Sequence, residues 1–143
     1  MRRHGLGELI RIIPGGHTEE AGAAAARLLL DGGSLPTAVV TFNDDSALGM
    51  LDTFIRAGIA VPGDVSIVGY DDSWVSRLSS VNLTTVGQDA DRMAALAVDR
   101  AIARLNGQAA AERESVLPPY LVVRGTTAAP SPRAVPLRRA RAR

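Results

Sequence analysis

The sequence contains no cysteine and no lysine, and only 3% of its 143 residues are aromatic. Without cysteine there can be no disulfide framework and no thiolate metal site. No apolar run approaches the roughly 20 residues that a membrane-spanning helix needs. The basic residues at the start of the chain are not followed by the apolar segment and cleavage site of a secretory signal. We therefore expect a cytoplasmic protein with no membrane partner.

The charged residues are unevenly distributed along the chain. All 16 basic residues are arginines, and five of them follow Thr127 in a stretch without acids. The part up to Gly125 holds 11 basic and 15 acidic residues, a net charge of −4, which is not the footprint of a nucleic-acid-binding domain. Residues 128–143 are rich in Pro, Ala and Arg without periodicity, so we expect a disordered tail there. Residues 1–127 are expected to form one domain.

Short apolar runs alternate with longer amphipathic ones, which predicts an α/β fold with a mostly parallel sheet flanked by helices. Thr18, one of Asp44 and Asp45, and Asp89 are suitable N-terminal caps for the three expected helices. The run 38–42 is apolar on both faces, as expected when helices cover both sides of a parallel sheet. The expected strands are 8–13, 38–42, 65–70, 83–86 and a bent or paired segment over 115–124; the expected helices begin after these caps and end near Gly32, Gly58 and Asn106.

Polar side chains follow three of the expected strands. Asn43, Asp71 and Gln88 each come at a strand end, and His17 lies in the turn after the first expected strand. Because small molecules bind outside the carboxyl ends of parallel strands, these residues form a candidate binding site. Asn and Gln both donate and accept hydrogen bonds, whereas an ionised Asp only accepts. The set suits a polyhydroxylated or amide-bearing small molecule, against which the His17 ring could pack.

Each of these residues also has an ordinary structural interpretation. Asp71 could form an Asx turn, Asn43 could be a cap or turn residue, and Gln88 and His17 could simply be solvated. No nucleophile elbow, phosphate-binding loop or dinucleotide-binding glycine motif occurs. The pairs Asp44-Asp45 and Asp71-Asp72 could bind Mg²⁺, and a small enzyme using them is one alternative. We expect no catalytic residue, no metal and no cofactor.

Several longer motifs resemble one known family. The phrases P-T-A-V-V-T-F-N-D-D-S-A-L-G, G-I-A-V-P-G-D-V-S-I-V-G-Y-D-D, L-T-T-V-G-Q and P-P-Y-L-V-V-R-G-T-T resemble the C-terminal part of lactose/galactose-repressor (LacI/GalR) family transcriptional regulators. The resemblance covers about residues 8–127. It implies a periplasmic-binding-protein-like effector domain of type I, with two α/β subdomains around a cleft. Such domains bind sugars, nucleosides or purines and signal to a DNA-binding helix-turn-helix.

The resemblance also implies roles for individual residues. Asn43 would face the effector, Asp71 would accept hydrogen bonds from ligand hydroxyls, and Gln88 would lie at the hinge. His17 occupies a place where relatives often present an aromatic ring, although its own ring is an imidazole. A homodimer interface is implied for one helix and the loop after Asp72, through Leu48, Leu51, Trp74 and Leu78, with core burial as the alternative for these side chains.

The chain departs from the family pattern in what it contains. It lacks a helix-turn-helix, nearly all of the N-terminal subdomain and the first strand–helix unit of its own subdomain, so contact with DNA is expected only through a helix-turn-helix absent from this chain. In the family, the helix over 90–105 packs on the N-terminal subdomain; here we expect its apolar face to drive self-association. The alternative to a sensing and oligomerising part of a regulator is a fragment of a periplasmic sugar-binding protein of a transporter.

Overall fold

Three short parallel strands and one antiparallel strand form the sheet of this chain. The computed structural model describes residues 1–108 and 114–131. The strands are β1 (Ala38–Val40), β2 (Ser66–Asp71), β3 (Thr85–Gly87) and β4 (Tyr120–Val122), in the spatial order β1-β2-β3-β4. The pairs β1/β2 and β2/β3 are parallel, and β3/β4 is antiparallel. The expected α/β class with a mostly parallel sheet is confirmed.

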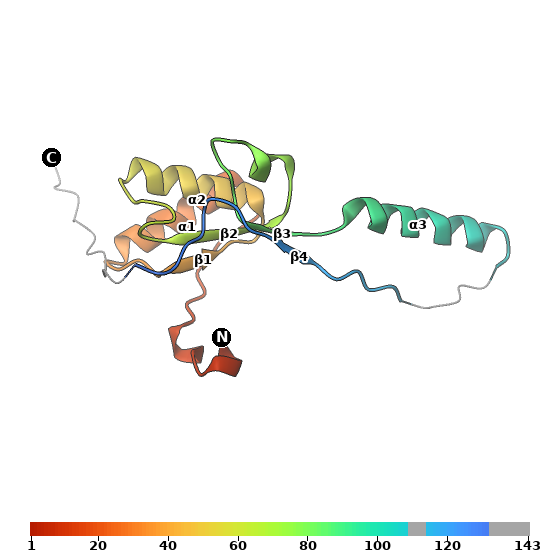
Figure 1. Cartoon of the computed structure of the whole chain (residues 1–143), viewed down its shortest axis with the longest axis horizontal. Helices are drawn as coiled ribbons and strands as arrows, with labels where there is room; N and C mark the ends of the chain where they lie inside the picture. Colours follow the sequence, from red (N-terminus) through yellow and green to blue (C-terminus); the bar gives the residue numbers. More distant parts are fainter. Residues whose placement is uncertain (109–113, 132–143) are drawn as a thin grey trace.

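Two helices pack beside this sheet and enclose the core (Figure 1). They are α1 (Glu19–Asp31), capped by the Thr18 hydroxyl as expected, and α2 (Asp44–Arg56). The two helices approach closely because Gly22 lies against the backbone of Ser46 and Gly49 lies against that of Glu19, where a Cβ would overlap. The centre of the core is fully buried and is made by Phe54, Val65, Ile67 and Leu83.

The start of α2 differs from the expected capping by an aspartate. Asn43 is the cap: its Oδ1 accepts from the Ser46 backbone N–H at 3.0 Å, and Ser46 Oγ accepts from the Asn43 N–H at 3.2 Å. This reciprocal pair satisfies two backbone donors of the helix end. Asp44 instead turns its carboxylate into the core, where it is only 1% exposed. Its Oδ1 accepts from Thr85 Oγ1 at 2.6 Å and its Oδ2 from the Ser73 N–H at 2.7 Å.

The expectation of helices on both sides of the sheet is not met by the described residues. Val39 and Ile67 face the core, whereas their neighbours Val40 and Val68, and Leu121 on β4, point to the other face. On that face Val40 and Leu121 are exposed. The apolar residues at 38–42 therefore give the sheet a second apolar face. Among the described residues, no helix covers this face.

Two of the expected strands do not form. The segment over 8–13 contains a short 3-10 turn, η2 (Gly7–Leu9), preceded by η1 (Arg2–His4), and then has no regular structure. Residues 115–117 are not a strand either. β-branched residues favour a strand only where a neighbouring strand and a packing surface receive them, and Ile12 in this segment is almost fully exposed. The prediction of a strand there was wrong.

The third helix, α3 (Ala90–Leu105), stands away from the sheet (Figure 1). Asp89 caps it as expected, accepting from the Arg92 N–H at 3.1 Å, yet none of its residues is buried. The chain leaves the body after β3 and returns along β4, so α3 lies at the end of a projecting arm (Figure 1). None of the helices within residues 1–108 and 114–131 has the length and apolar character of a membrane span. The expected disordered tail lies mostly outside the described residues, since only 128–131 of it are included.

We predict that Asp44→Ala lowers the free energy of unfolding by about 2–4 kcal/mol, because it leaves the Ser73 N–H and the Thr85 hydroxyl buried without a partner. Urea titration followed by the fluorescence of the single tryptophan measures the loss. Asp45→Ala is the matched control, since Asp45 is exposed and its removal should change stability by no more than about 0.5 kcal/mol. Equal losses in the two variants would contradict the structural role of Asp44.

Candidate functional site

Asp71 and Gln88 meet at the carboxyl end of the parallel strands. The register pairs Asp71 at the end of β2 with Gly87 at the end of β3, which brings the next residue, Gln88, alongside. Gln88 Nε2 donates to Asp71 Oδ1 at 2.8 Å. Asp71 is exposed and Gln88 is half-buried. The sequence places these residues 17 positions apart, and parallel pairing is what joins them.

Asn43 and His17 form a second pair at the end of β1. Asn43 Nδ2 donates to the backbone carbonyl of His17 at 3.0 Å, which fixes the turn that carries the histidine. The His17 ring lies 6.2 Å, centroid to centroid, from the ring of Phe42, with the planes tilted by 56°. Phe42 is 72% exposed. An open aromatic pair thus flanks the amide of Asn43.

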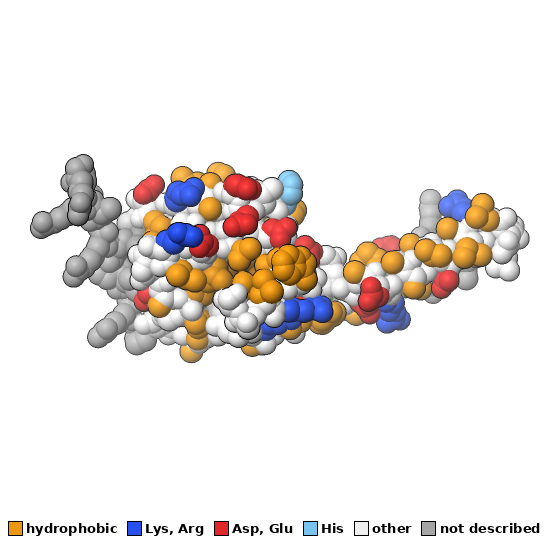
Figure 2. All heavy atoms as spheres, turned by 90° about the horizontal axis from the view of Figure 1, so that it is seen from above, with side chains coloured by type: hydrophobic (Ala, Val, Ile, Leu, Met, Phe, Trp, Pro, Cys, Tyr) orange, Lys and Arg blue, Asp and Glu red, His pale blue; other side chains and the backbone are white. Residues whose placement is uncertain are grey.

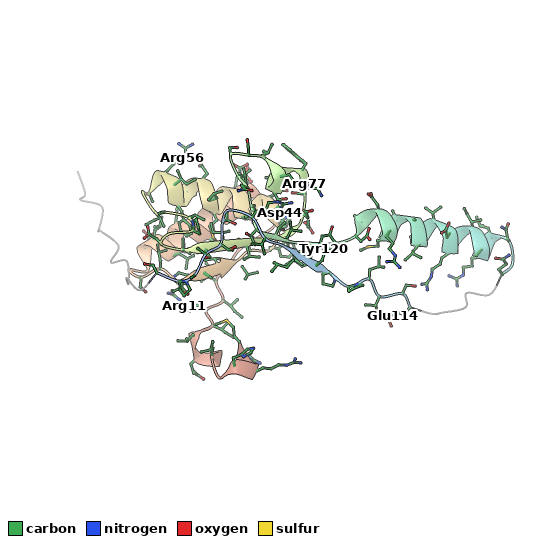
Figure 3. The ribbon with its side chains drawn as sticks, viewed as in Figure 1. Arg11, Asp44, Arg56, Arg77, Glu114 and Tyr120 are labelled. Carbon is green, nitrogen blue, oxygen red and sulfur yellow. The ribbon has the colours of Figure 1, made fainter. Side chains whose placement is uncertain are left out.

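The buried carboxylate of Asp44 links the two pairs. Asp44 directly follows Asn43, its Oδ2 accepts from Ser73 two residues beyond Asp71, and its Oδ1 accepts from Thr85 on β3. The ends of β1, β2 and β3 therefore lie at one edge of the sheet, and Figure 3 shows Asp44 within this edge. Asn43, Asp71 and Gln88 share that edge as the pattern of strand ends requires.

The groove beside β1 does not include these side chains. A groove of about 390 Å³ runs beside β1 and contains Phe42, but none of the four predicted ligand residues lines it. It is formed by Ile13, Gly15, Gly16, Gly22, Ala25, Val39, Val40, Thr41, Phe42, Ser46 and Met50. The predicted site therefore lies outside this groove.

Two aromatic residues near the site were missed by sequence reasoning. Phe42 was assigned only to the strand that precedes Asn43. Tyr120 lies in register with Gly87, and a Cβ on Gly87 would overlap the Tyr120 ring. Figure 3 shows Tyr120 where the sheet gives way to the arm, in the same cross-strand row as Asp71. The glycine in T-T-V-G-Q is the only feature of the sequence that indicates the position of the Tyr120 ring. It can be interpreted only once the pairing of Gly87 with Tyr120 is known.

Asp72, the residue after Asp71, forms the principal ion-pair cluster of this edge. Its Oδ1 lies 2.6 Å from Arg124 Nη2 and its Oδ2 lies 2.8 Å from Arg77 Nη2. Burial acts to raise the pKa of Asp72, but the hydrogen bonds from Arg124, Arg77 and Ser76 outweigh it and hold the pKa below the ordinary value of 3.8. Because Asp44 and Asp72 are already bonded to protein donors, they do not fit the Mg²⁺ alternative. Within residues 1–108 and 114–131, no group of three or more acidic or histidine side chains could hold a metal ion.

The four predicted interface residues differ in exposure. Trp74, in the short helix η3 (Trp74–Arg77), is 73% exposed, and Leu78 just after it is also exposed. Leu48 is half-buried on α2, whereas Leu51 is only 6% exposed and packs in the core. Figure 2 shows apolar side chains gathered on the face formed by α2 and η3. Leu51 therefore has little surface left for a partner, and Trp74 has the most.

Comparison with known proteins identifies the family of this chain. Residues 1–127 match the model of the periplasmic binding protein-like domain. The chain is 41% identical over 121 residues to the HTH-type transcriptional regulator MalR of Streptomyces coelicolor, a match covering 84% of this chain and 35% of that protein. It superimposes on a LacI transcriptional regulator from a Rhodococcus species with a TM-score of 0.82 and 48% identity, covering 88% of this chain and 46% of the other. For a LacI-family regulator from Lactobacillus casei with bound sucrose the values are 0.68 and 32%, with coverage of 78% and 41%.

This chain belongs to the periplasmic binding protein-like domain family, and it corresponds to the C-terminal effector-domain part of LacI-family transcriptional regulators. The resemblance seen in the sequence motifs is thereby confirmed. The chain spans about a third of the length of the curated relatives it matches. These relatives are transcriptional regulators rather than enzymes, and they do not favour the transporter alternative.

We predict that Asp72→Asn lowers the free energy of unfolding at pH 7 by about 3 kcal/mol, because it leaves the half-buried Arg124 without its charge partner. The parent protein should lose this contribution as the pH falls below about 4, since a lowered folded-state pKa stabilises only above the unfolded-state value. Urea unfolding at a series of pH values tests both points. A variant whose stability falls as steeply with acid as that of the parent would contradict the role of this carboxylate.

Proposed function

We propose that this chain is the effector-sensing and oligomerising part of a LacI-type transcriptional regulator that acts in the cytoplasm. The observation that carries the proposal is the contact between Asp71 and Gln88 at the carboxyl ends of parallel strands, in a chain of this family. Specific DNA binding would require a helix-turn-helix, which residues 1–108 and 114–131 do not form.

The chemistry of the edge supports a sugar or nucleoside-like effector. Asp71 accepts from Gln88 through Oδ1, so among the described residues its Oδ2 remains available for a ligand hydroxyl. Asn43 uses one of its two amide hydrogens on His17, and the second can meet a ligand oxygen. The rings of His17, Phe42 and Tyr120 offer flat surfaces beside these polar groups, and the apolar face of a sugar or base packs well on such rings.

We predict that Asp71→Ala weakens sugar binding tenfold to a hundredfold, since a hydrogen bond to a charged group contributes about 1.5–3 kcal/mol. The ligand for the test is sucrose, the molecule bound by the Lactobacillus casei relative. Titration followed by amide NMR signals measures affinities into the millimolar range, which suits a chain that spans only part of its relatives.

The exposed Asp45→Ala variant is the control for this titration and should bind as the parent does. Equal affinity of the Asp71→Ala variant would remove Asp71 from the site. If neither sucrose nor a nucleoside shifts the signals of residues 43, 71 and 88, the effector proposal fails.

The same proposal includes self-association through the face of α2 and η3. An exposed tryptophan is the kind of anchor that dominates protein interfaces, and Trp74 is 73% exposed with the exposed Leu78 four residues further on. The alternative surface is α3, along whose length apolar side chains are exposed (Figure 2), among them Val98, Ile102 and Leu105.

We predict that Trp74→Ala converts a concentration-dependent dimer into a monomer in analytical ultracentrifugation, whereas Ile102→Ser on α3 leaves the dimer in place. The two variants remove exposed apolar side chains from different surfaces, so each serves as control for the other. The reverse result would assign association to α3. A parent chain that stays monomeric at high concentration would contradict self-association altogether.

A further inference from the structure

We propose that Arg124 is a positioning residue of the effector site, which holds the turn at Asp71 and Asp72 in place and ties it to the loop carrying Trp74. This inference rests on the proposed function, because it assumes that Asp71 contacts the effector. It assigns a role to the arginine of V-V-R-G-T-T, which lies 52 residues beyond Asp72 and bonds to the carboxylate of that residue.

The turn needs an external restraint because its backbone is unusual. Asp71 has φ of 109° and Asp72 has φ of 51°, both in a region that side chains other than glycine rarely adopt. Aspartate tolerates such a conformation better than most residues, but it persists only where the surroundings hold it. The direction of the Asp71 carboxylate, and hence its contact with Gln88, depends on this turn.

Arg124 supplies much of that restraint. Its Nη2 pairs with Asp72 Oδ1 at 2.6 Å, while its Nη1 donates to Leu83 O at 2.9 Å and to Ser76 Oγ at 3.1 Å. Its backbone N–H donates to Thr84 Oγ1 at 2.9 Å. One guanidinium therefore fixes the turn after β2 to the segment that leads into β3. The planar fork of arginine reaches these partners together, whereas a lysine ammonium would act as a single point charge.

The same guanidinium reaches the loop with the predicted interface. Ser76, in η3, has one hydroxyl hydrogen, which is shared between Ser73 O at 2.7 Å and Asp72 Oδ1 at 3.1 Å, and its Oγ accepts from Arg124 Nη1 at 3.1 Å. Trp74 lies between Ser73 and Ser76 in the sequence and is therefore held at both sides. If a ligand displaced Asp71, the adjacent Asp72 would move with it and would shift Trp74, which is only three residues from Asp71.

A second arginine gives a matched control. Arg77 donates to the other oxygen of Asp72, but its side chain is 63% exposed, compared with 17% for Arg124. Solvent screens an exposed ion pair, so Arg77 should contribute less to the turn. Arg77→Lys and Arg124→Lys make the same chemical change on the same carboxylate and differ in burial and in the number of partners.

The test uses NMR spectra of the full chain, with the Gln88 side-chain amide and the indole N–H of the single tryptophan as reporters. In Arg124→Lys we expect the Gln88 signals to move toward those of an unpaired glutamine and the Trp74 signal to shift. The amide signals of Gly22 and Gly49 at the contact between α1 and α2 should not move. Arg77→Lys should produce less than half of either change. Unchanged reporters in Arg124→Lys, or equal changes in the two variants, would overturn the proposal.

Ser76→Ala keeps the proposal testable if Arg124→Lys fails to fold. It removes the hydroxyl shared by Arg124, Asp72 and Ser73, and we expect smaller shifts of both reporters in the same direction. Reporters that stay at the parent positions in this variant would overturn the proposal as well.

A double-mutant comparison separates this inference from the proposed function. Asp71→Ala should shift the Trp74 indole signal in the parent but not in the Arg124→Lys background, because the connection is already lost there. A shift of equal size in both backgrounds would show that the connection does not pass through Arg124. Sucrose titration is interpreted independently. If sucrose does not bind but the coupling between Asp71 and Trp74 through Arg124 is observed, only the effector proposal is contradicted. If sucrose binds but the reporter signals are unchanged in Arg124→Lys, only the positioning role is contradicted.

Discussion

The buried carboxylate of Asp44 is the contact on which the arrangement of this edge depends. A buried polar side chain is costly unless its polar atoms have partners, and the two Asp44 oxygens accept from Thr85 on β3 and from Ser73 after β2. Gly69 leaves the space that this carboxylate occupies, since a Cβ there would overlap it. Helix α2, the loop after β2 and strand β3 are thereby fixed to one another by a single side chain. Asn43 directly precedes Asp44, while Asp71 and Gln88 lie within three residues of Ser73 and Thr85.

Much of the fold could be predicted from the sequence because the signals are local. Thr18 and Asp89 cap the helices that they were expected to cap, and the turns at Gly32 and Gly58 follow the helix ends. The meeting of Asp71 and Gln88 also follows from a general property of parallel sheets. By contrast, the segment at 8–13 has β-branched residues but no strand beside it, and propensity alone could not reveal that.

What the sequence could not supply were the roles that depend on burial and register. Three aspartates occupy similar positions after strands in the sequence. In the structure, however, Asp44 is buried, Asp71 is exposed and Asp72 is paired with two arginines. The sequence allowed Asn43, Asp44 or Asp45 to cap α2, and the choice of Asn43 depends on Asp44 turning inward at the first position of the helix. The roles of Tyr120 and Arg124 depend on the antiparallel return of β4, a contact between residues more than thirty positions apart.

The isolation of α3 has a consequence for its own stability. A helix of 16 residues in water gains little from hydrogen bonding alone, because its first turn is entropically unfavourable to form. The cap at Asp89 and the contact of Arg100 with Ser115 offset only part of that cost. The helical content of α3 should therefore depend on packing of its apolar side chains against another surface. Without such a surface, the segment would exchange between helix and coil. Folding of α3 and its docking on such a surface would then be a single thermodynamic event.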